Sequence, residues 1–330
     1  MTMTVSVVLT VLNEAKNLAA LLDDLLAQSL PPDEIVIVDG GSTDGTRALL
    51  QRYADRHPSI KVFVEPGVNI ARGRNLAIAR ATGEIIAVTD GGCRPDPDWL
   101  RELIAPFQRD PEVDAVAGRI CAIGTTRFDY YNGLLSIPEG AGTSQTRMFY
   151  GRSSAFRRAL WARIGGYPEW LYTAEDSLFA LRAQGLGAKI VSAPASRLLW
   201  YPRPTLFKTA KMFYLYGRGN GHIQRGDLKG TLYWLRYHAL WLATLAAGFW
   251  QPWLWLGTAA TLAQLLRISV GPALRQLEAA GVQAPDRFFY VPLIVLTRNL
   301  ATNLGYLAGH LEYRRNATFR ERLRAYRELP

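Results

Sequence analysis

The sequence predicts an α/β fold, a doubly wound and mostly parallel sheet, followed by a helical and apolar carboxyl-terminal region. Three observations support this prediction. Short apolar runs alternate with helical periodicity over the first 90 residues, the chain turns basic after residue 197, and a long uncharged stretch follows. Alternation of strands and helices is typical of parallel sheets, whereas long uncharged stretches are typical of membrane-associated segments.

The alternation starts at the amino terminus. Residues 5–12 form an apolar run that we interpret as a buried strand, because it is too short for a secretory signal. Leucines at helical spacing follow, and Pro31-Pro32 ends that helix before the apolar run 35–38. The next elements are expected as a helix over 46–56, a strand over 61–64, a helix over 70–81 and a strand over 84–89. Ligands on such sheets bind at the carboxyl ends of the strands.

The composition of the chain bears on its partners and on the kinds of site that it can form. The chain has 330 residues, 49% of them hydrophobic, and a formal net charge of +10. This charge favours anionic partners such as nucleotides, phospholipid headgroups or nucleic acid. The two cysteines, Cys93 and Cys121, are too few for a disulfide framework and lack the spacing of zinc ligands.

The last third of the chain differs from the rest, and we place a domain boundary between residues 205 and 206. Residues 197–236 carry eight basic residues and one acidic residue, and residues 239–266 carry no charge. The uncharged stretch exceeds the roughly 20 residues that a spanning helix needs. A second apolar stretch, 288–311, is interrupted by Arg298 and is a weaker candidate.

Two interpretations of residues 239–266 remain open. One is membrane attachment, by spanning or by lying in the interface with its tryptophans at headgroup level. The other is a helical hairpin buried in the protein and turned at Gln251-Pro252. If the segment is membrane-bound, the basic flanks predict an inner-membrane protein whose amino-terminal domain, residues 1–205, faces the cytoplasm.

Polar side chains follow several predicted strands directly. Asn13 and Glu14 follow the first strand, Asp39 the second, and Asp90 the strand over 84–89. We expect these groups to meet at one edge of the sheet and to form a polar ligand site. The loop 40–45 after Asp39 could instead be a tight turn with a helix cap, although capping does not require an acid at the end of a strand.

Five segments, in this order, resemble glycosyltransferase family 2, inverting nucleotide-sugar enzymes with a GT-A-type fold. The resemblance covers about residues 4–200. Its pieces are Leu12-Asn13-Glu14, Val38-Asp39-Gly40-Gly41-Ser42-Thr43-Asp44-Gly45-Thr46, Arg74-Asn75 with Ala81-Thr82-Gly83-Glu84, Thr89-Asp90-Gly91-Gly92 before Pro97-Asp98-Trp99-Leu100, and Glu175-Asp176. Tyr216-Gly217-Arg218-Gly219 ahead of apolar segments resembles the membrane-associated members that build bacterial exopolysaccharides such as succinoglycan.

The resemblance implies a nucleotide-sugar site, with UDP as the expected carrier. The residues that it assigns to the base and ribose are Asn13, Glu14, Asp39 and Arg74. It places the donor diphosphate near Asp90, where the family carries an Asp-X-Asp motif that holds Mg²⁺ or Mn²⁺, but Gly92 stands at the last acid of that motif. Either Asp90 alone holds a divalent cation, or Arg94 or Arg218 replaces part of its positive charge.

The pair Glu175-Asp176 precedes leucines at helical spacing, so both acids are expected in the first turn of a helix. The helix dipole alone would favour carboxylates there. The resemblance implies instead that Asp176 is the catalytic base and that Glu175 faces the diphosphate or the acceptor.

The predicted activity is the transfer of a sugar to a hydroxyl of a lipid-linked or saccharide acceptor, in the synthesis of cell-surface polysaccharide or glycolipid. The expected partners are the donor, the acceptor and an anionic membrane, and not nucleic acid. Because Gly92 replaces an acid, the alternative is a catalytically degenerate nucleotide-sugar-binding scaffold within a membrane complex.

Overall fold

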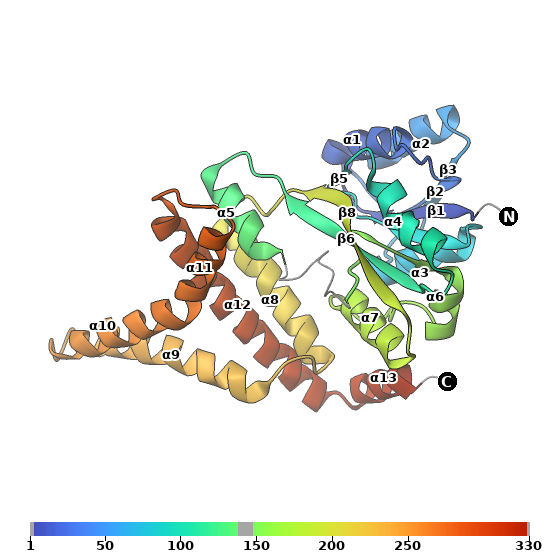
Figure 1. The fold of residues 1–330 in the computed structure, drawn as a ribbon. Coiled ribbons are helices and arrows are strands. Elements are labelled where there is room, and N and C mark those ends of the chain that lie inside the picture. The colour runs from blue at the N-terminus through green and yellow to red at the C-terminus, as the bar shows by residue number, and fades with distance from the viewer. Residues whose placement is uncertain (1–2, 138–147, 329–330) are drawn as a thin grey trace. The chain divides into compact units, whose positions relative to one another are not determined.

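The computed structural model describes residues 3–137 and 148–328, and the chain divides into two compact units (Figure 1). The first unit comprises Met1–Ile123, Ile137–Tyr201 and Arg324–Pro330, and the second comprises Gly124–Ser136 and Pro202–Leu323. The division at 201/202 lies close to the boundary that we placed at 205/206. The sequence did not indicate that residues 124–136 belong to the second unit.

The first unit is built on one eight-stranded sheet with the order β3-β2-β1-β4-β7-β6-β8-β5. The strands are β1 (Val5–Val11), β2 (Glu34–Asp39), β3 (Ile60–Val64), β4 (Ile85–Val88), β5 (Cys93–Pro95), β6 (Ala115–Ala122), β7 (Ser154–Arg157) and β8 (Ile190–Trp200). The first four strands are parallel, as are β6 and β8. β7 is antiparallel to β4 and β6, and β5 to β8, so the sheet is mixed rather than uniformly parallel.

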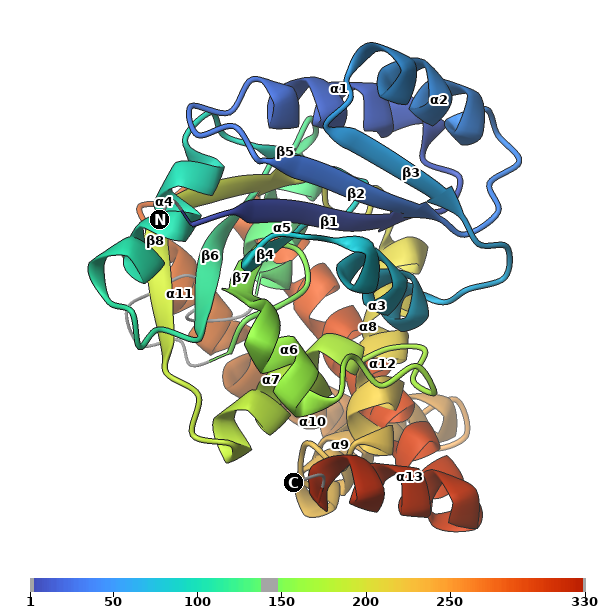
Figure 2. The same ribbon diagram turned by 90° about the vertical axis from the view of Figure 1, so that its right-hand side faces the viewer.

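Helices cover both faces of the parallel strands, which explains why apolar residues dominate the buried strands β1, β2 and β4. Helices α1 (Ala15–Leu26) and α2 (Thr46–Arg56) lie on one face and α3 (Ile70–Arg80) on the other (Figure 2). In α1, the leucines at positions 18, 21, 22 and 25 are fully buried, because their spacing places them on the face toward the sheet. The further helices of this unit are α4 (Trp99–Arg109), α6 (Arg158–Ile164) and α7 (Glu175–Gly185).

The register of the sheet determines where polar loops gather. Val11 pairs with Asp39 across β1 and β2, and Val8 pairs with Val88 across β1 and β4. The carboxyl ends of β1, β2 and β4 therefore open at one edge of the sheet, where residues 12–14, 40–45 and 89–92 follow them.

The second unit is helical. Its helices are α5 (Arg127–Ser136), α8 (Leu206–His222), α9 (Leu228–Ala247), α10 (Leu254–Leu265), the π-helix η1 (Leu266–Val270), α11 (Gly271–Ala279) and α12 (Arg287–Arg315); α13 (Ala317–Glu328) follows and reaches into the first unit. One apolar core joins α5, α11 and α12, and in it the rings of Tyr131 and Tyr290 stack with centroids 5.5 Å apart. The hydroxyl of Tyr131 donates to Asp286 Oδ1 at 2.7 Å.

The uncharged stretch 239–266 is not one continuous helix. It is divided between α9 and α10, which form a helical hairpin that turns over residues 248–253. The hairpin that we considered at Gln251-Pro252 is therefore present, but most of its large apolar side chains are exposed rather than buried. In the part of the chain that the structure describes, no helix combines the length and the apolar character that a membrane-spanning helix needs.

Helices α8 and α12 approach each other through glycines (Figure 1). Cβ atoms built at Gly305 and Gly309 of α12 would lie 2.0 Å from the carbonyl oxygens of Tyr214 and Arg218. From the other side, a Cβ at Gly217 of α8 would lie 2.1 Å from the carbonyl oxygen of Thr302. The glycines around Arg218 thus serve close helix packing within α8, which ends at His222.

Replacing Gly305 with alanine is expected to force α8 and α12 apart, since a backbone carbonyl cannot move away as a flexible side chain can. Overpacking of this kind costs about 1–3 kcal/mol. Denaturant unfolding followed by circular dichroism should show this loss for Gly305→Ala. Gly185→Ala on α7 is the control, because a Cβ there meets nothing within 4 Å; equal stability of the two variants would contradict the close packing.

Candidate active site

The first part of the site is a hydrogen-bonded loop after β2. The buried carboxylate of Asp39 accepts from the backbone N–H of Ser42 at 3.1 Å on both oxygens, and from the Ser42 hydroxyl. The N–H of Asn13 donates to Ser42 Oγ at 2.8 Å, and Asn13 Oδ1 accepts from the N–H of Thr43 at 2.9 Å. The loops after β1 and β2 are thereby held together, as their positions at one edge of the sheet predict.

Glu14 lies beside this loop and reaches toward the end of β4. Its backbone N–H donates to Thr46 Oγ1 at 2.9 Å. A Cβ built at Gly91 would meet Glu14 Cγ at 3.0 Å, so the Glu14 side chain packs against the backbone that follows Asp90.

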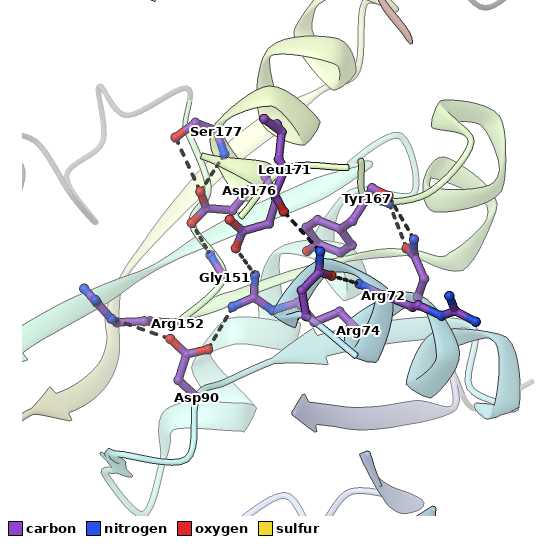
Figure 3. Close-up of polar contacts among 12 residues, drawn as sticks. Arg72, Arg74, Asp90, Gly151, Arg152, Tyr167, Leu171, Asp176 and Ser177 are labelled. Atoms are coloured by element: carbon purple, nitrogen blue, oxygen red, sulfur yellow. Dashed lines mark hydrogen bonds and ion pairs between the residues drawn. The ribbon is translucent and has the colours of Figure 1, made fainter. Parts of the chain in front are cut away.

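The centre of the site is the guanidinium of Arg74 on α3 (Figure 3). Its Nη1 donates to Glu175 Oε1 and its Nη2 to Asp90 Oδ1, both at 2.8 Å. The guanidinium carbon lies 5.6 Å from the centroid of the Tyr167 ring, and only 2% of the side chain is exposed. Burial opposes the charge of Arg74, but Asp90 and Glu175 outweigh it, so the pKa of the guanidinium is raised.

The two acids at the start of α7 have different surroundings. Glu175 is buried, and burial together with the neighbouring charge of Asp176 raises its pKa to about 7, although Arg74 lowers it. Asp176 is partly exposed, and two backbone N–H groups orient its carboxylate: that of Gly151 donates to Oδ2 at 3.2 Å and that of Ser177 to Oδ1 at 2.6 Å. Ala174 before them has φ +66°, a left-handed conformation that is uncommon for alanine.

Asp90 lies between two arginines. Besides its bond to Arg74, its Oδ2 lies 3.6 Å from Nε of Arg152, and the Arg152 guanidinium lies 4.5 Å from the centroid of the Trp200 ring. Figure 3 shows Arg74 and Arg152 on either side of the Asp90 carboxylate. The site thus combines acidic and basic groups from α3, α7, the end of β4 and the segment before β7.

These residues do not fit a divalent cation held by the protein. The one carboxylate at the expected position, Asp90, is engaged by Arg74 and faces Arg152, and Gly92 supplies no second acid. A Cβ at Gly92 would meet nothing within 4 Å, so no other side chain fills the place of that acid. Among residues 3–137 and 148–328, no three His, Cys, Asp or Glu side chains form a cluster that could bind a metal ion.

The structure brings Arg74, Asp90, Glu175 and Asp176 together, and it pairs the other two candidate arginines with carboxylates outside this group. Arg94 on β5 pairs with Asp24 of α1, with Nη2 to Oδ1 at 2.9 Å. Arg218 lies on α8 of the second unit, where its Nη2 is 3.0 Å from Oε2 of Glu312. Both guanidiniums are therefore already paired with a carboxylate.

Sequence reasoning missed three contributors: Arg152, Tyr167 and the backbone N–H of Gly151. Each reaches the site only through tertiary contacts, with Trp200, with Arg74 and with Asp176 respectively. The only signal in the sequence was the Gly151-Arg152 pair itself, and such pairs are common in loops.

Comparison with known proteins finds glycosyltransferases among the relatives of this chain. The model of the family "Glycosyl transferase family 2" matches residues 6–165. The chain is 25% identical over 195 residues to glycosyltransferase AglE of Haloferax volcanii, covering 57% of this chain and 64% of AglE. It is 29% identical over 227 residues to the succinoglycan biosynthesis protein ExoA of Rhizobium meliloti, covering 64% and 68%. The matched segment thus spans about two thirds of the length of these relatives.

Among solved structures, the chain is similar to the mannosyltransferase PcManGT from Pyrobaculum calidifontis, which was determined in complex with GDP-Man and Mn²⁺. The sequence identity is 26%, the TM-score is 0.61, and the match covers 93% of this chain and 88% of that one. This similarity supports a GT-A-like fold followed by a helical region.

The raised pKa of Glu175 predicts a pH-dependent stability. In the folded state the carboxyl group of Glu175 keeps its proton up to about pH 7, whereas in the unfolded chain its pKa has the ordinary value of 4.5. Protonation of Glu175 therefore stabilises the folded state fully below about pH 4.5, and this stabilisation is lost as the pH rises to about 7. The free energy of unfolding of the wild type should therefore fall, relative to that of Glu175→Gln, over this interval. Denaturant unfolding at a series of pH values measures it.

Glu169→Gln is the matched control for this measurement, because Glu169 belongs to the same unit and is exposed. Its difference from the wild type should not change over the same interval. Parallel curves for the wild type and Glu175→Gln would contradict the raised pKa.

Proposed function

Because the chain belongs to glycosyltransferase family 2, we propose that it moves a sugar from a nucleoside-diphosphate sugar to a hydroxyl group of an acceptor, with inversion at the anomeric carbon. The observation that carries this proposal is the meeting of Arg74, Asp90, Glu175 and Asp176 at the carboxyl edge of the sheet. These side chains come from separate elements, and a helix cap would not require them to converge.

The nucleotide is assigned to the loops after β1 and β2. The buried carboxylate of Asp39 holds the loop through Ser42, and the exposed Asn13 carries an amide oxygen that can accept from the imide N–H of a base or from a ribose hydroxyl. Glu14, beside Gly91, connects this part of the site with the end of β4. UDP is the carrier that we expect. GDP is the alternative carrier to test, because the structure of PcManGT was determined with GDP-Man.

Asp176 is assigned as the catalytic base, because it is the acid that an acceptor can reach. Glu175 is buried and bonded to Arg74, whereas Asp176 is partly exposed and its carboxylate is oriented by backbone N–H groups. The acceptor oxygen attacks the anomeric carbon while its proton passes to Asp176. The bond from the anomeric carbon to the diphosphate oxygen breaks, and the nucleoside diphosphate leaves with the electron pair.

The charge that develops on the leaving diphosphate must meet a cation. Arg74 already bonds two carboxylates, so Arg152 is the guanidinium that we assign to this role. Its guanidinium lies over the Trp200 ring and beside Asp90, and a guanidinium can bind phosphate oxygens in a bidentate manner. In this proposal Arg152 takes the role for which the sequence suggested Arg94 or Arg218.

The acceptor is proposed to be a saccharide or lipid-linked saccharide. Similarity to ExoA, which is a succinoglycan biosynthesis protein, supports this class of acceptor. The alternative of a nucleotide-sugar-binding scaffold without catalysis predicts binding of the donor and no turnover with any acceptor.

Asp176→Asn should retain donor binding and lose transfer by about 10²- to 10⁴-fold, since general-base assistance has that magnitude. The measurement is donor turnover by the purified protein with a panel of UDP- and GDP-sugars and a membrane lipid extract, with donor binding followed by calorimetry. Asp55→Asn, a change on the exposed surface of α2, is the control. Donor binding by the wild type without turnover in any combination would favour the scaffold.

Arg152→Ala should lower turnover by about 10²-fold or more, because it removes a charge that faces the leaving group. Arg94→Ala is the matched control, since it also removes an arginine paired with an aspartate and should have little effect. The same proposal predicts that wild-type turnover persists in EDTA. Loss of all turnover in EDTA, or equal effects of the two arginine variants, would contradict the role of Arg152.

A further inference from the structure

The hairpin formed by α9 and α10 exposes large apolar side chains at its turn. The hairpin tip, which we define as Phe249, Trp250, Trp253 and Leu256, has exposed fractions of 76%, 80%, 66% and 75%. Side chains of this size are usually buried in soluble proteins, and a contiguous exposed group of them marks an interaction surface.

The hairpin is also suited to a surrounding without water. Residues 237–266 contain no Lys, Arg, Asp or Glu. Its hydroxyl groups are bonded within the hairpin: Thr244 donates to the Leu240 carbonyl at 3.0 Å, Thr258 to Thr244 Oγ1 at 3.0 Å, and Thr261 to the Gly257 carbonyl at 2.8 Å. Polar groups satisfied in this way carry little desolvation cost when they enter lipid.

Close packing holds the two arms together near the tip. A Cβ at Gly248 would lie 2.0 Å from the Trp255 ring, and the Trp255 ring in turn contacts that of Phe249 edge to face at 5.8 Å. The tip side chains therefore project from a packed hairpin, and they are not the frayed end of a helix.

The charge of the protein is concentrated in the unit that carries this hairpin. The second unit has 16 Lys and Arg against 6 Asp and Glu, whereas the first has 22 of each, so the whole net charge of +10 lies in the second unit. Basic residues near an anionic bilayer contribute on the order of 1 kcal/mol each. Apolar insertion and electrostatic attraction thus come from the same unit.

We propose that the hairpin tip inserts into the interface of an anionic lipid bilayer and holds the second unit at its surface. Tryptophan is enriched at this depth because its ring is amphipathic. Interfacial elements of this kind enter by roughly 5–10 Å, which does not require a spanning helix. This inference stands independently of the proposed function. The expectation that the surface is the cytoplasmic face of a cell membrane stays a prediction.

The test is co-sedimentation of the full chain with vesicles of phosphatidylglycerol and phosphatidylcholine, and with vesicles of phosphatidylcholine alone. The wild type should bind the anionic vesicles more tightly, and added salt should weaken that binding. The double variant Trp250→Ser with Trp253→Ser keeps the charge and should bind at least about tenfold more weakly, since it removes two large apolar side chains. Brominated lipids should quench the fluorescence that these two tryptophans contribute.

Leu311→Ser is the control, because Leu311 is also exposed, at 41%, but lies near the carboxyl end of α12 and not at the turn between α9 and α10. It should bind as the wild type does. Because the substituted tryptophans are exposed, circular dichroism of the double variant should match the wild type. Unchanged vesicle binding by that variant, no binding by the wild type, or a dimer that the tryptophan substitutions dissociate would each overturn the proposal.

Discussion

The buried guanidinium of Arg74 is the interaction on which the site depends. A charge with 2% exposure is tolerated only when it is paired, and Arg74 is paired twice, with Asp90 after β4 and with Glu175 at the start of α7. Removing one partner from such a buried pair costs about 3–5 kcal/mol, because the other charge is left uncompensated. Arg74 therefore holds α3, the end of β4 and α7 in one arrangement.

The Arg74 guanidinium also gives the neighbouring acidic residues different surroundings. It binds Glu175, whose pKa burial has already raised, and the proposed reaction therefore uses the adjacent, partly exposed Asp176 as its base. It also occupies one oxygen of Asp90, which a divalent cation would otherwise use. In the proposed reaction, the two guanidiniums beside Asp90 supply positive charge at the place where the family resemblance led us to expect a second acid and a metal ion.

The sequence predicted the local parts of this architecture well and the tertiary parts less well. Buried parallel strands such as β1 and β2 are mostly apolar, and the family's motifs lie at their carboxyl ends, so both could be found by inspection. The contribution of Arg152, the pairing of Arg94 with Asp24 and the position of α5 in the second unit depend on contacts between distant segments. No periodicity or spacing in the chain encodes those contacts.

The apolar stretch after residue 239 was ambiguous for a physical reason. Its length in residues fits a span, but the turn at 248–253 divides it between two helices, and α10 continues directly through η1 into α11 beyond the uncharged stretch. The second unit nevertheless has two features that are common in membrane proteins. Helices α8 and α12 pack through glycines, and threonine hydroxyls of the hairpin form hydrogen bonds within it. The proposed attachment of the hairpin tip to a lipid surface would let an acceptor carried on a lipid reach the enzyme by diffusing in two dimensions.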